Sequence, residues 1–389
     1  MSRQFDRRSA GVAIAGAATF LNLYNTQAVL PDIAESFGVG VLKAGLTITA
    51  PLLAVACVAP FAGTISDRLG RKPLIVGAAS LLVLPTLLVA AAPNLGVMVF
   101  WRFLQGLLLP FIFTVCIAYI GDECPGSHGI RTAGAYSAGT IFGGFSGRMI
   151  VGLVAEYGGW RAGFLVIAAC SAALALLIGL ILPRERNFEP LQGGVRGALS
   201  SYVEHFHSRR LLATCLIGFC MLFTNVGGYT YVNFYLAAPP FNLGPSQLGM
   251  MFTVYLLGVF TTPVATRFAV RIGRRVTLAL SVACTTVGLL LTLWQHLPAV
   301  LAGLALMSGG LFVVQALSLG FIATTTRHAK STAVGLYVTV FYIGGSLGGL
   351  VPGSLWNHVG WPGVVGLLVL VQSVIVGTAT YFWRDARPA

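Results

Sequence analysis

The chain has 389 residues, of which 56% are hydrophobic and only 9% are charged. Soluble proteins usually carry about 25% charged residues, so this chain lacks the charge to cover a soluble domain of its size. Its net charge of +13 could suggest a nucleic-acid partner, but no basic stripe with interleaved aromatic residues occurs. The composition therefore predicts an integral membrane protein without a nucleic-acid partner.

Twelve apolar runs follow one another along the chain, each near the roughly 20 residues that cross about 30 Å of hydrocarbon. They lie near 11–32, 44–66, 73–92, 95–120, 131–154, 161–182, 210–236, 246–269, 276–295, 298–324, 331–355 and 361–383. The first apolar run is too long for the core of a cleaved signal peptide, so we expect it to remain as the first span.

The longest polar interruption, 184–208, divides the twelve spans into two groups of six. We therefore expect an all-α membrane protein with an N-terminal six-helix bundle (1–183), a cytoplasmic linker (184–208) and a C-terminal six-helix bundle (209–389). With the N-terminus inside, the inner segments carry 20 Lys and Arg residues and the outer loops carry 2. The positive-inside rule then places both termini in the cytoplasm and explains the basic net charge.

The two halves of the sequence resemble each other at a nearly constant offset. "KAGLTIT" (43–49) aligns with "QLGMMFT" (247–253), "RLGRKPLI" (68–75) with "RIGRRVTL" (271–278), and "GTIFGG" (139–144) with "GGSLGG" (344–349). Two related six-helix halves are the layout of many secondary transporters.

Three motifs carry a resemblance to a known family. "GTISDRLGRK" (63–72) resembles the loop 2–3 signature of the major facilitator superfamily, and "WRFLQGLLLP" (101–110) resembles its fourth-helix motif R-x-x-Q-G. The glycine run of the fifth span resembles a motif of its exporter branches. Within the superfamily, "YNTQAVLPDIAESFG" (24–38) and "GGFSGRMIVG" (143–152) look most like bacterial drug and sugar efflux permeases of the proton-antiporter type.

The motif between spans 2 and 3 predicts a sharp turn with a basic cytoplasmic anchor. Gly70 suits the turn, while Asp67 can meet a helix N-terminus or a basic side chain of the neighbouring bundle. The resemblance implies a latch for the outward-facing state, to which we assign Gly63, Asp67, Arg68, Gly70 and Arg71. A plain positive-inside anchor is the alternative, but it leaves Asp67 unexplained.

Glycines recur every four residues in the fifth span, at Gly139, Gly143 and Gly147. Small residues at this spacing let helices approach closely in lipid, so we expect a hinge-like packing ridge. We expect the matching ridge of the second half at Gly345, Gly349 and Gly353.

Two arginines, Arg102 and Arg148, lie inside predicted spans. A guanidinium facing lipid is costly, so each should face the bundle interior, water or a partner, with snorkelling as the alternative for Arg148. Many proton antiporters of the family carry a carboxylate nine residues before a Leu-Pro pair in the first helix, and here that position holds Asn22. We therefore predict that Asp32 is the titratable partner of these arginines, in a coupling group with Gln105, unless it is an ordinary helix-end charge.

A polar stripe in the first span and its counterpart in the seventh predict a central substrate cavity. Buried amides and hydroxyls in hydrocarbon need partners, and neighbouring spans add aromatic candidates. The predicted cavity residues are Asn22, Tyr24, Asn25, Thr26, Tyr229, Asn233, Tyr255, Gln315, Phe341 and Tyr342. Such a cavity suits an uncharged, lipophilic or anionic solute.

The favoured function is secondary active transport of a small organic solute by alternating access, as proton-coupled efflux across the bacterial inner membrane. Uptake or facilitated diffusion of a metabolite is the alternative, and a membrane sensor or membrane enzyme is remote. No HExxH, G-x-S-x-G or Walker motif appears, so we expect neither an enzyme nor direct ATP drive. The seven scattered cysteines include no CxxC pair, and we expect no metal, no cofactor and a monomer.

Overall fold

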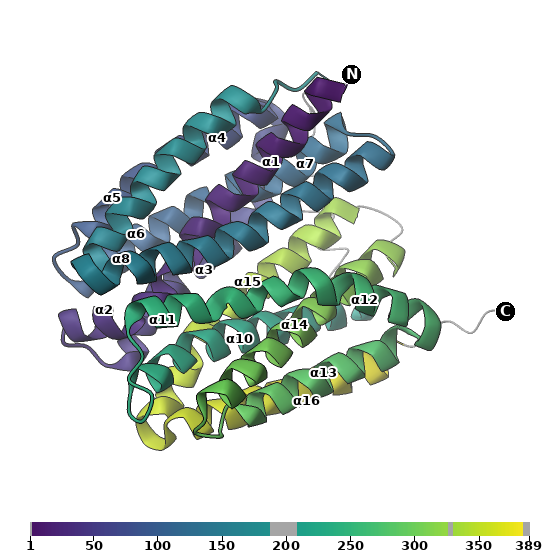
Figure 1. Cartoon of the computed structure of the whole chain (residues 1–389). Helices are drawn as coiled ribbons and strands as arrows, with labels where there is room; N and C mark the ends of the chain where they lie inside the picture. Colours follow the sequence, from purple (N-terminus) through teal and green to yellow (C-terminus); the bar gives the residue numbers. More distant parts are fainter. Residues whose placement is uncertain (1, 187–207, 326–329, 384–389) are drawn as a thin grey trace. The chain divides into compact units, whose positions relative to one another are not determined.

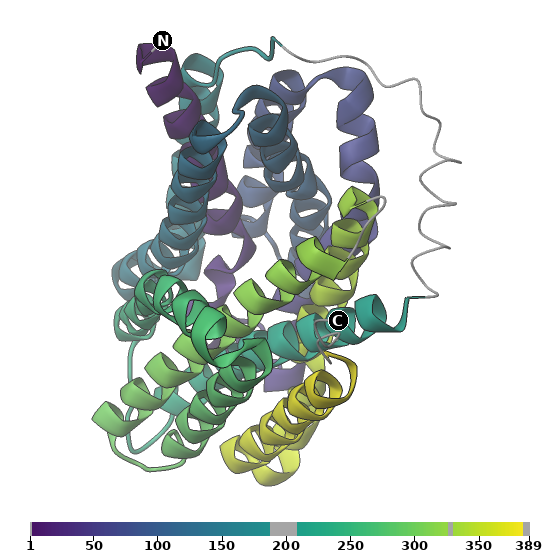
Figure 2. The same cartoon turned by 90° about the vertical axis from the view of Figure 1, so that its right-hand side faces the viewer.

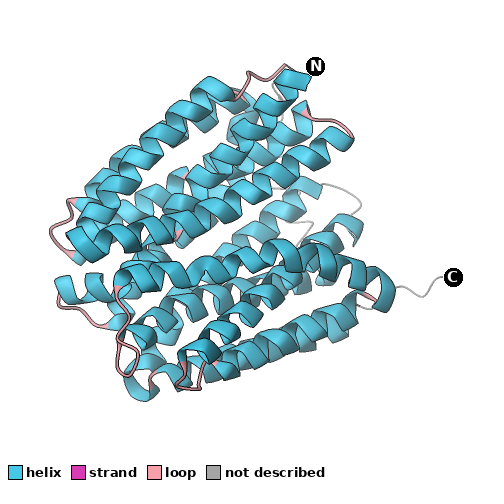
Figure 3. Ribbon diagram, in the orientation of Figure 1, coloured by secondary structure: helices cyan, strands magenta, loops and turns pink. Residues whose placement is uncertain are grey.

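The computed structural model describes residues 2–186, 208–325 and 330–383. This part of the chain consists of helices joined by short connections and contains no strand (Figure 1, Figure 3). Its contacts divide the chain into two compact units. The first comprises Met1–Gly193 and Leu243–Phe252, and the second comprises Gly194–Asn242 and Thr253–Ala389.

Helices of the first unit run side by side along most of their length (Figure 1, Figure 2). In chain order they are α1 (Ser2–Leu23), the 3-10 helix η1 (Asn25–Val29), α2 (Leu30–Ser36), α3 (Val41–Leu69), α4 (Arg71–Leu81), α5 (Val83–Ala90), α6 (Leu95–Leu108), α7 (Pro110–Glu123), α8 (Ser127–Ile181) and α11 (Pro245–Met250).

The second unit contains the remaining helices. They are α10 (Arg209–Ala237), α12 (Leu257–Ile272), α13 (Arg274–Leu291), α14 (Leu297–Thr325), α15 (Lys330–Val359) and α16 (Trp361–Phe382). The 3-10 helix η2 (Met251–Leu256) contains the point at which the chain passes from the first unit to the second.

Nine helices of the described residues are long and apolar enough to cross a membrane. One of them, α8, has 55 residues and includes both the fifth and the sixth predicted spans. The two parts meet at a kink at Gly159, whose φ of 74° is not helical. Such a φ suits glycine, which has no Cβ to clash. The first and eighth predicted spans are instead interrupted by η1 and η2.

The start of the eighth span differs from the expected division into halves, because residues 243–252 pack in the first unit. Two glycines allow this: a side chain at Gly152 of α8 would collide with the Pro245 carbonyl, and one at Gly249 would meet the Arg148 carbonyl oxygen. Glu156 adds a polar contact, since its Oε2 accepts a hydrogen bond from the Ser246 N–H at 3.1 Å.

The glycine ridge of α8 packs directly on α1. A side chain at Gly139, Gly143 or Gly147 would collide with the backbone of α1, at the carbonyl groups of Ala13, Ala17 and Leu21 in turn. The four-residue spacing is therefore used on both helices at once, which brings their backbones into contact.

In the second unit α15 approaches α10 in the same way, at two glycines that were not predicted. Side chains at Gly344 and Gly348 would collide with the carbonyl groups of Phe219 and Phe223. The expected ridge of Gly345, Gly349 and Gly353 lies one position further along α15 and stays a prediction. A helix advances about 100° per residue, so a shift of one position turns a ridge well away from its neighbour.

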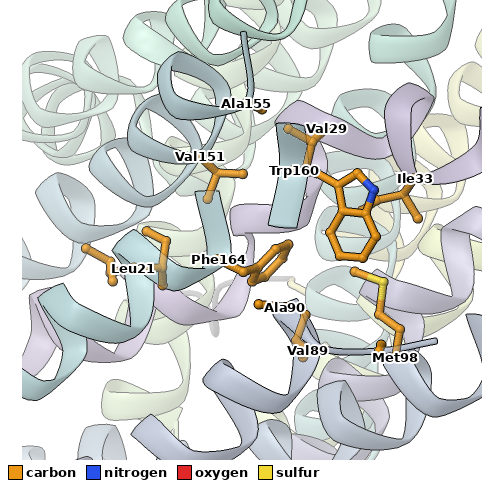
Figure 4. Close-up of a cluster of buried hydrophobic side chains, with 12 residues drawn as sticks. Leu21, Val29, Ile33, Val89, Ala90, Met98, Val151, Ala155, Trp160 and Phe164 are labelled. Atoms are coloured by element: carbon orange, nitrogen blue, oxygen red, sulfur yellow. The ribbon is translucent and has the colours of Figure 1, made fainter. Parts of the chain in front are cut away.

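A buried hydrophobic cluster lies in the first unit and fixes the helices around the break in the first span. Its labelled members come from η1, α2 and the helices beside them (Figure 4). Trp160 is 3% exposed and follows the bend at Gly159, and its indole Nε1 donates to Ser36 Oγ at 3.0 Å. The cluster thus holds the short helix α2 against α8.

Candidate functional site

Two helix irregularities in the first unit leave backbone carbonyl groups without their usual helical partners. The helix α1 ends at Leu23, and the chain continues as the 3-10 helix η1. In α3, Pro51 has no N–H to donate to the carbonyl four residues earlier, which belongs to Thr47. Orphaned carbonyl groups at membrane depth must be satisfied by protein groups or by water in a cavity.

Arg102 of α6 supplies the missing donors. Its side chain is fully buried, and its Nε donates to the Thr47 carbonyl at 3.0 Å. Its Nη1 donates to the Asn22 carbonyl at 2.7 Å and its Nη2 to the Leu23 carbonyl at 2.6 Å. The fixed fork of a guanidinium suits this task, since one group reaches three carbonyls on two helices.

Two side-chain amides complete the contacts of this guanidinium. Its Nη1 lies 2.7 Å from Gln105 Oε1 and 3.3 Å from Asn25 Oδ1. Because both amide oxygens face the guanidinium, both NH₂ groups point away from it. Gln105 Nε2 donates to Thr86 Oγ1 at 2.7 Å, whereas Asn25 Nδ2 is buried and has no hydrogen-bond partner among the described residues.

Asn22 joins three helices through the same polar network. Its Oδ1 lies 3.1 Å from Thr86 Oγ1 of α5, and its Nδ2 donates to Ser171 Oγ of α8 at 2.9 Å. The Nδ2 also donates to the Ala18 carbonyl of its own helix at 3.0 Å. The amide therefore has both its donor and its acceptor side occupied within the first unit.

Arg148 lies on the other side of η1 and is 2% exposed. Its Nε donates to Gln27 Oε1 at 2.8 Å and its Nη1 to the Gly144 carbonyl at 2.6 Å. Its guanidinium carbon lies 4.8 Å from the ring centre of Tyr24 and 4.5 Å from that of Phe252. The guanidinium therefore lies inside the first unit and does not snorkel, and cation–π contacts stabilise it there.

The turn η1 is thus bracketed by two arginines. Arg102 contacts Asn25 at its start and Arg148 contacts Gln27 two residues later. Thr26 lies between them, and its Oγ1 is also buried without a hydrogen-bond partner among the described residues. Polar groups of this kind are expensive in a protein interior and mark functional sites in membrane proteins.

The second unit builds its polar core differently. Tyr229 Oη donates to the Leu304 carbonyl at 2.9 Å, and its ring centre lies 4.6 Å from that of Tyr255. Tyr255 Oη donates to Asn225 Oδ1 at 2.8 Å. Asn233 Nδ2 donates to the Tyr229 carbonyl, which leaves its buried Oδ1 without a partner among the described residues.

The first helix of the second unit is not broken. The helix α10 runs without interruption from Arg209 to Ala237, so its carbonyl groups keep their helical partners. The position that corresponds to Arg102 in the repeat is Leu306. A contact between α10 and α16 remains, since Gln372 Nε2 donates to Thr224 Oγ1 at 2.8 Å.

The other candidates of the second unit lie on α14 and α15. Gln315 is half-buried. Phe341 and Tyr342 are buried with ring centres 5.4 Å apart, and Phe341 also stacks on Tyr337 at 5.7 Å. The structure therefore groups Tyr229, Asn233 and Tyr255 around α10 and pairs the two aromatic residues on α15.

Asp32 is half-buried on α2 and makes no hydrogen bond or ion pair within the described residues. Its electrostatic neighbours are two other carboxylates, Glu35 and Glu156. The partners of Arg102 are carbonyl and amide oxygens, so the structure does not bring Arg102 and Asp32 together.

The loop motif forms a charged cluster around Arg71. Its guanidinium lies 2.6 Å from Asp67 Oδ1 and 3.0 Å from Asp122 Oδ2 of α7. Glu185 caps the start of α4, because its carboxylate accepts the backbone N–H groups of Arg71 at 2.9 Å and of Lys72 at 3.2 Å. Asp67 thus pairs with a cation of its own unit.

The loop motif contains three further predicted residues. Arg68 is exposed and Gly63 has open space around it. Gly70 ends α3 with φ of 90°, a conformation that glycine adopts without strain. The equivalent Gly273 has φ of 89°, so the turn is present in both units.

Sequence reasoning missed several residues of these two clusters. Thr47 could have been found, because a proline lies four residues after it. The remaining ones carried no such signal, since their roles depend on contacts between distant helices: Gln27, Thr86, Asp122, Ser171, Glu185 and Phe252.

Comparison with known sequences agrees with this architecture. The sequence profile of the Major Facilitator Superfamily matches residues 12–239 and 219–389. The chain therefore belongs to the Major Facilitator Superfamily and is a membrane transporter of that type.

Bacterial relatives cover almost all of the chain. It is 30% identical over 377 residues to the inner membrane transport protein YnfM of Escherichia coli, which covers 96% of this chain and 90% of that protein. It is 28% identical over 377 residues to the uncharacterized MFS-type transporter YybF of Bacillus subtilis, with 96% and 92% covered.

Solved structures share the fold at low sequence identity. A bacterial homologue of the human lysosomal transporter Spinster, inward-facing and unoccupied, aligns with a TM-score of 0.76 at 13% identity over 98% of this chain and 95% of that one. The nucleoside transporter NupG (D323A mutant) aligns with a TM-score of 0.77 at 14% identity over 97% and 100%.

Proposed function

We propose that this transporter is a secondary carrier that moves a small organic solute by alternating access. The observation that carries the proposal is the break between α1 and α2, where buried polar groups remain unpaired within the described residues. Broken helices that expose polar backbone and side-chain groups at membrane depth are the binding elements of many secondary transporters.

The proposed solute contacts are given for each unit by itself. In the first unit they are Asn22, Tyr24, Asn25 and Thr26, which lie at or beside the break. In the second unit they are Tyr229, Asn233, Tyr255, Gln315, Phe341 and Tyr342.

We further propose efflux coupled to protons, with Asp32 as the group that takes up and releases the proton. A carboxylate that no cation holds in an ion pair is free to exchange its proton with water. Arg102, Gln105 and Arg148 complete the coupling group, because their hydrogen bonds connect both ends of η1 to α6 and α8.

The charged cluster around Arg71 is proposed as the conformational latch of the cytoplasmic side. Asp67 and Arg71 are its ion pair, Gly63, Arg68 and Gly70 complete the motif, and the ridge of Gly139, Gly143 and Gly147 is its hinge. The close backbone contact of α8 with α1 supports this assignment, since small residues at this spacing give the two helices a smooth packing face.

The alternative is uptake or facilitated diffusion of a metabolite without protons. One observation favours it: Asn22 holds the first-helix position at which proton antiporters of the family carry an acid, and its amide is fully engaged. For either direction we propose the bacterial inner membrane, cytoplasmic termini, and a monomer without enzymatic activity or a nucleic-acid partner.

Proteoliposomes with an internal pH-sensitive dye and an imposed proton gradient test the proposal. We would add lipophilic drugs, sugars and organic anions in turn, and compare the wild type with Asp32→Asn. Glu35→Gln is the matched control, because it neutralises an exposed carboxylate on the same helix α2.

We expect one compound to collapse the gradient in the wild type and in Glu35→Gln but not in Asp32→Asn. Flux of a compound without proton movement would establish the alternative and make Asp32 a helix-end charge. Absence of flux for every compound class would contradict the proposed transport of small organic solutes.

A further inference from the structure

We propose that the solute carries an anionic oxygen group, a carboxylate or its equivalent, and that Asn25 and Thr26 are the donors that recognise it. This inference rests on the transport function proposed above and narrows it to one class of substrate. It follows from the charge and from the unused hydrogen-bond donors around η1.

Arg102 lies beside η1, and no carboxylate among the described residues pairs with its guanidinium. All five hydrogen bonds of its guanidinium go to neutral oxygens. Among the residues whose burial is described, Glu123 is the one buried acid, and it pairs with Arg8 at 2.7 Å at the cytoplasmic end of α7. The guanidinium therefore retains a full buried charge.

Arg102 orients one of the donors that remain at η1. Since Asn25 Oδ1 faces Arg102, the amide can only present its NH₂ group to a further partner, and that group is unpaired within the described residues. The next residue, Thr26, adds an unpaired buried hydroxyl. The side chains of η1 therefore offer donors to a ligand, while the amide acceptor of Asn25 is already taken.

A ligand that fits this arrangement must supply acceptors and negative charge. A carboxylate offers two oxygens with about four lone-pair positions, and charge-assisted hydrogen bonds are roughly twice as strong as neutral ones. Such a group would also lower the cost of burying the Arg102 charge, because the attraction of an opposite charge offsets part of the desolvation penalty of a buried ion. A neutral amide or sugar hydroxyl would provide no such compensation.

The first test asks, without any ligand, whether the Arg102 guanidinium is stabilised by a carboxylate placed beside it. In Asn25→Asp the new carboxylate lies beside Arg102 Nη1, where the amide oxygen is 3.3 Å away. We expect the purified full-length variant to melt at or above the wild-type temperature in detergent, while Asn25→Leu melts lower. A fall in melting temperature for Asn25→Asp as large as that for Asn25→Leu would overturn the inference.

The second test measures recognition with matched pairs of small molecules, namely benzoate against benzamide and acetate against acetamide. We expect the acids to raise the melting temperature of the wild type more than their amides. Thr26→Val should weaken the apparent affinity for benzoate roughly tenfold, the equivalent of one lost hydrogen bond to a charged group. Asn25→Asp should abolish binding by repulsion.

Thr19→Val is the matched control, because Thr19 is equally buried on α1 and its hydroxyl already donates to the Ala15 carbonyl at 2.9 Å. Equal effects of Thr19→Val and Thr26→Val, equal effects of each acid and its amide, or no effect of either acid would overturn the inference. Flux of a neutral compound in proteoliposomes would then still support transport. Benzoate binding without any flux would instead contradict the proposed function and leave the anion site standing.

Discussion

Arg102 donates its Nε hydrogen to the carbonyl of Thr47 at 3.0 Å, the same carbonyl that Pro51 leaves without a helical donor. One side chain thus repairs a helix in α3 while it also caps the end of α1. Gly106, one turn after Arg102, makes this possible, since a side chain there would collide with the Pro51 carbonyl. The R-x-x-Q-G motif therefore has a structural reason in this chain: the arginine donates, the glutamine orients, and the glycine permits the approach.

Removal of this arginine should destabilise the protein strongly. Arg102→Met leaves three carbonyl groups unsatisfied, and each buried unsatisfied group costs about 1–3 kcal/mol. We expect a loss of several kcal/mol in the free energy of unfolding, measured in detergent with a denaturant. Arg209→Met, which changes an exposed arginine at the start of α10, should change it by about 0.5 kcal/mol or less.

The pairing of Arg102 with Thr47 can be tested through Pro51. Pro51→Ala restores an N–H that can donate to the Thr47 carbonyl, so the loss of Arg102 should cost about 1 kcal/mol less in that background. A double-mutant cycle measures this difference. Strict additivity of Pro51→Ala and Arg102→Met would show that the Thr47 carbonyl does not depend on the arginine.

The glycine ridge of α8 offers a further prediction, and a glycine of the same helix serves as its control. Gly143→Ala places a methyl group against the Ala17 carbonyl of α1, and such overpacking typically costs about 1–3 kcal/mol. Gly134→Ala lies on the same helix with open space around it, so the better helix propensity of alanine should leave stability unchanged or raise it by up to about 1 kcal/mol. We would compare the melting temperatures of the two variants in the same detergent. Equal melting temperatures would contradict the close contact of Gly143 with α1.

Much of the fold is readable from the sequence because hydrocarbon imposes simple rules on length and charge. Apolar runs near 20 residues predict helices, and the helices observed in α3, α10 and α16 match them closely. The four-residue glycine spacing predicts a backbone contact, which the structure shows between α8 and α1. It does not say which neighbour is contacted, and in the second half the glycines that meet α10 are Gly344 and Gly348, one position before the expected ridge.

The site is less predictable because its geometry depends on breaks in helices. Such breaks cannot be recognised in a sequence when the residues around them are apolar. The break after Leu23 lies within an apolar run, and neither glycine nor proline marks it until Pro31. Asn22 and Asn25 were therefore grouped as one polar stripe, whereas the structure uses the first as a link between helices and the second as a partner of Arg102. The role of α11 in the first unit is likewise invisible to a division at the longest polar loop.

The charged cluster around Arg71 makes a further prediction. Asp67 and Asp122 share one cation, so Asp67→Asn and Asp122→Asn should each cost about 1 kcal/mol or less, as expected for partly exposed ion pairs. In a double-mutant cycle their effects should not add, because Arg71 retains one carboxylate in each single variant and none in the double variant. Additive losses in the free energy of unfolding would argue against a shared network.

The last prediction concerns the contact of α11 with the first unit. Glu156 Oε2 accepts the Ser246 N–H at the start of α11, where N–H groups have no helical partner and the helix dipole favours negative charge. Glu156→Ala should therefore speed hydrogen exchange of the backbone amides around Ser246 by about 2- to 30-fold, the equivalent of about 0.5–2 kcal/mol for a lost cap.

Glu156→Gln keeps an acceptor oxygen and loses the charge, so its exchange should lie between that of the wild type and that of Glu156→Ala. Glu35→Ala removes an exposed carboxylate on α2 and should leave these amides unchanged. Because η2 joins α11 to the second unit through the chain itself, a looser α11 should also slow transport in proteoliposomes. Unchanged exchange in Glu156→Ala would mean that the paired glycines Gly152 and Gly249 hold α11 without help from this carboxylate.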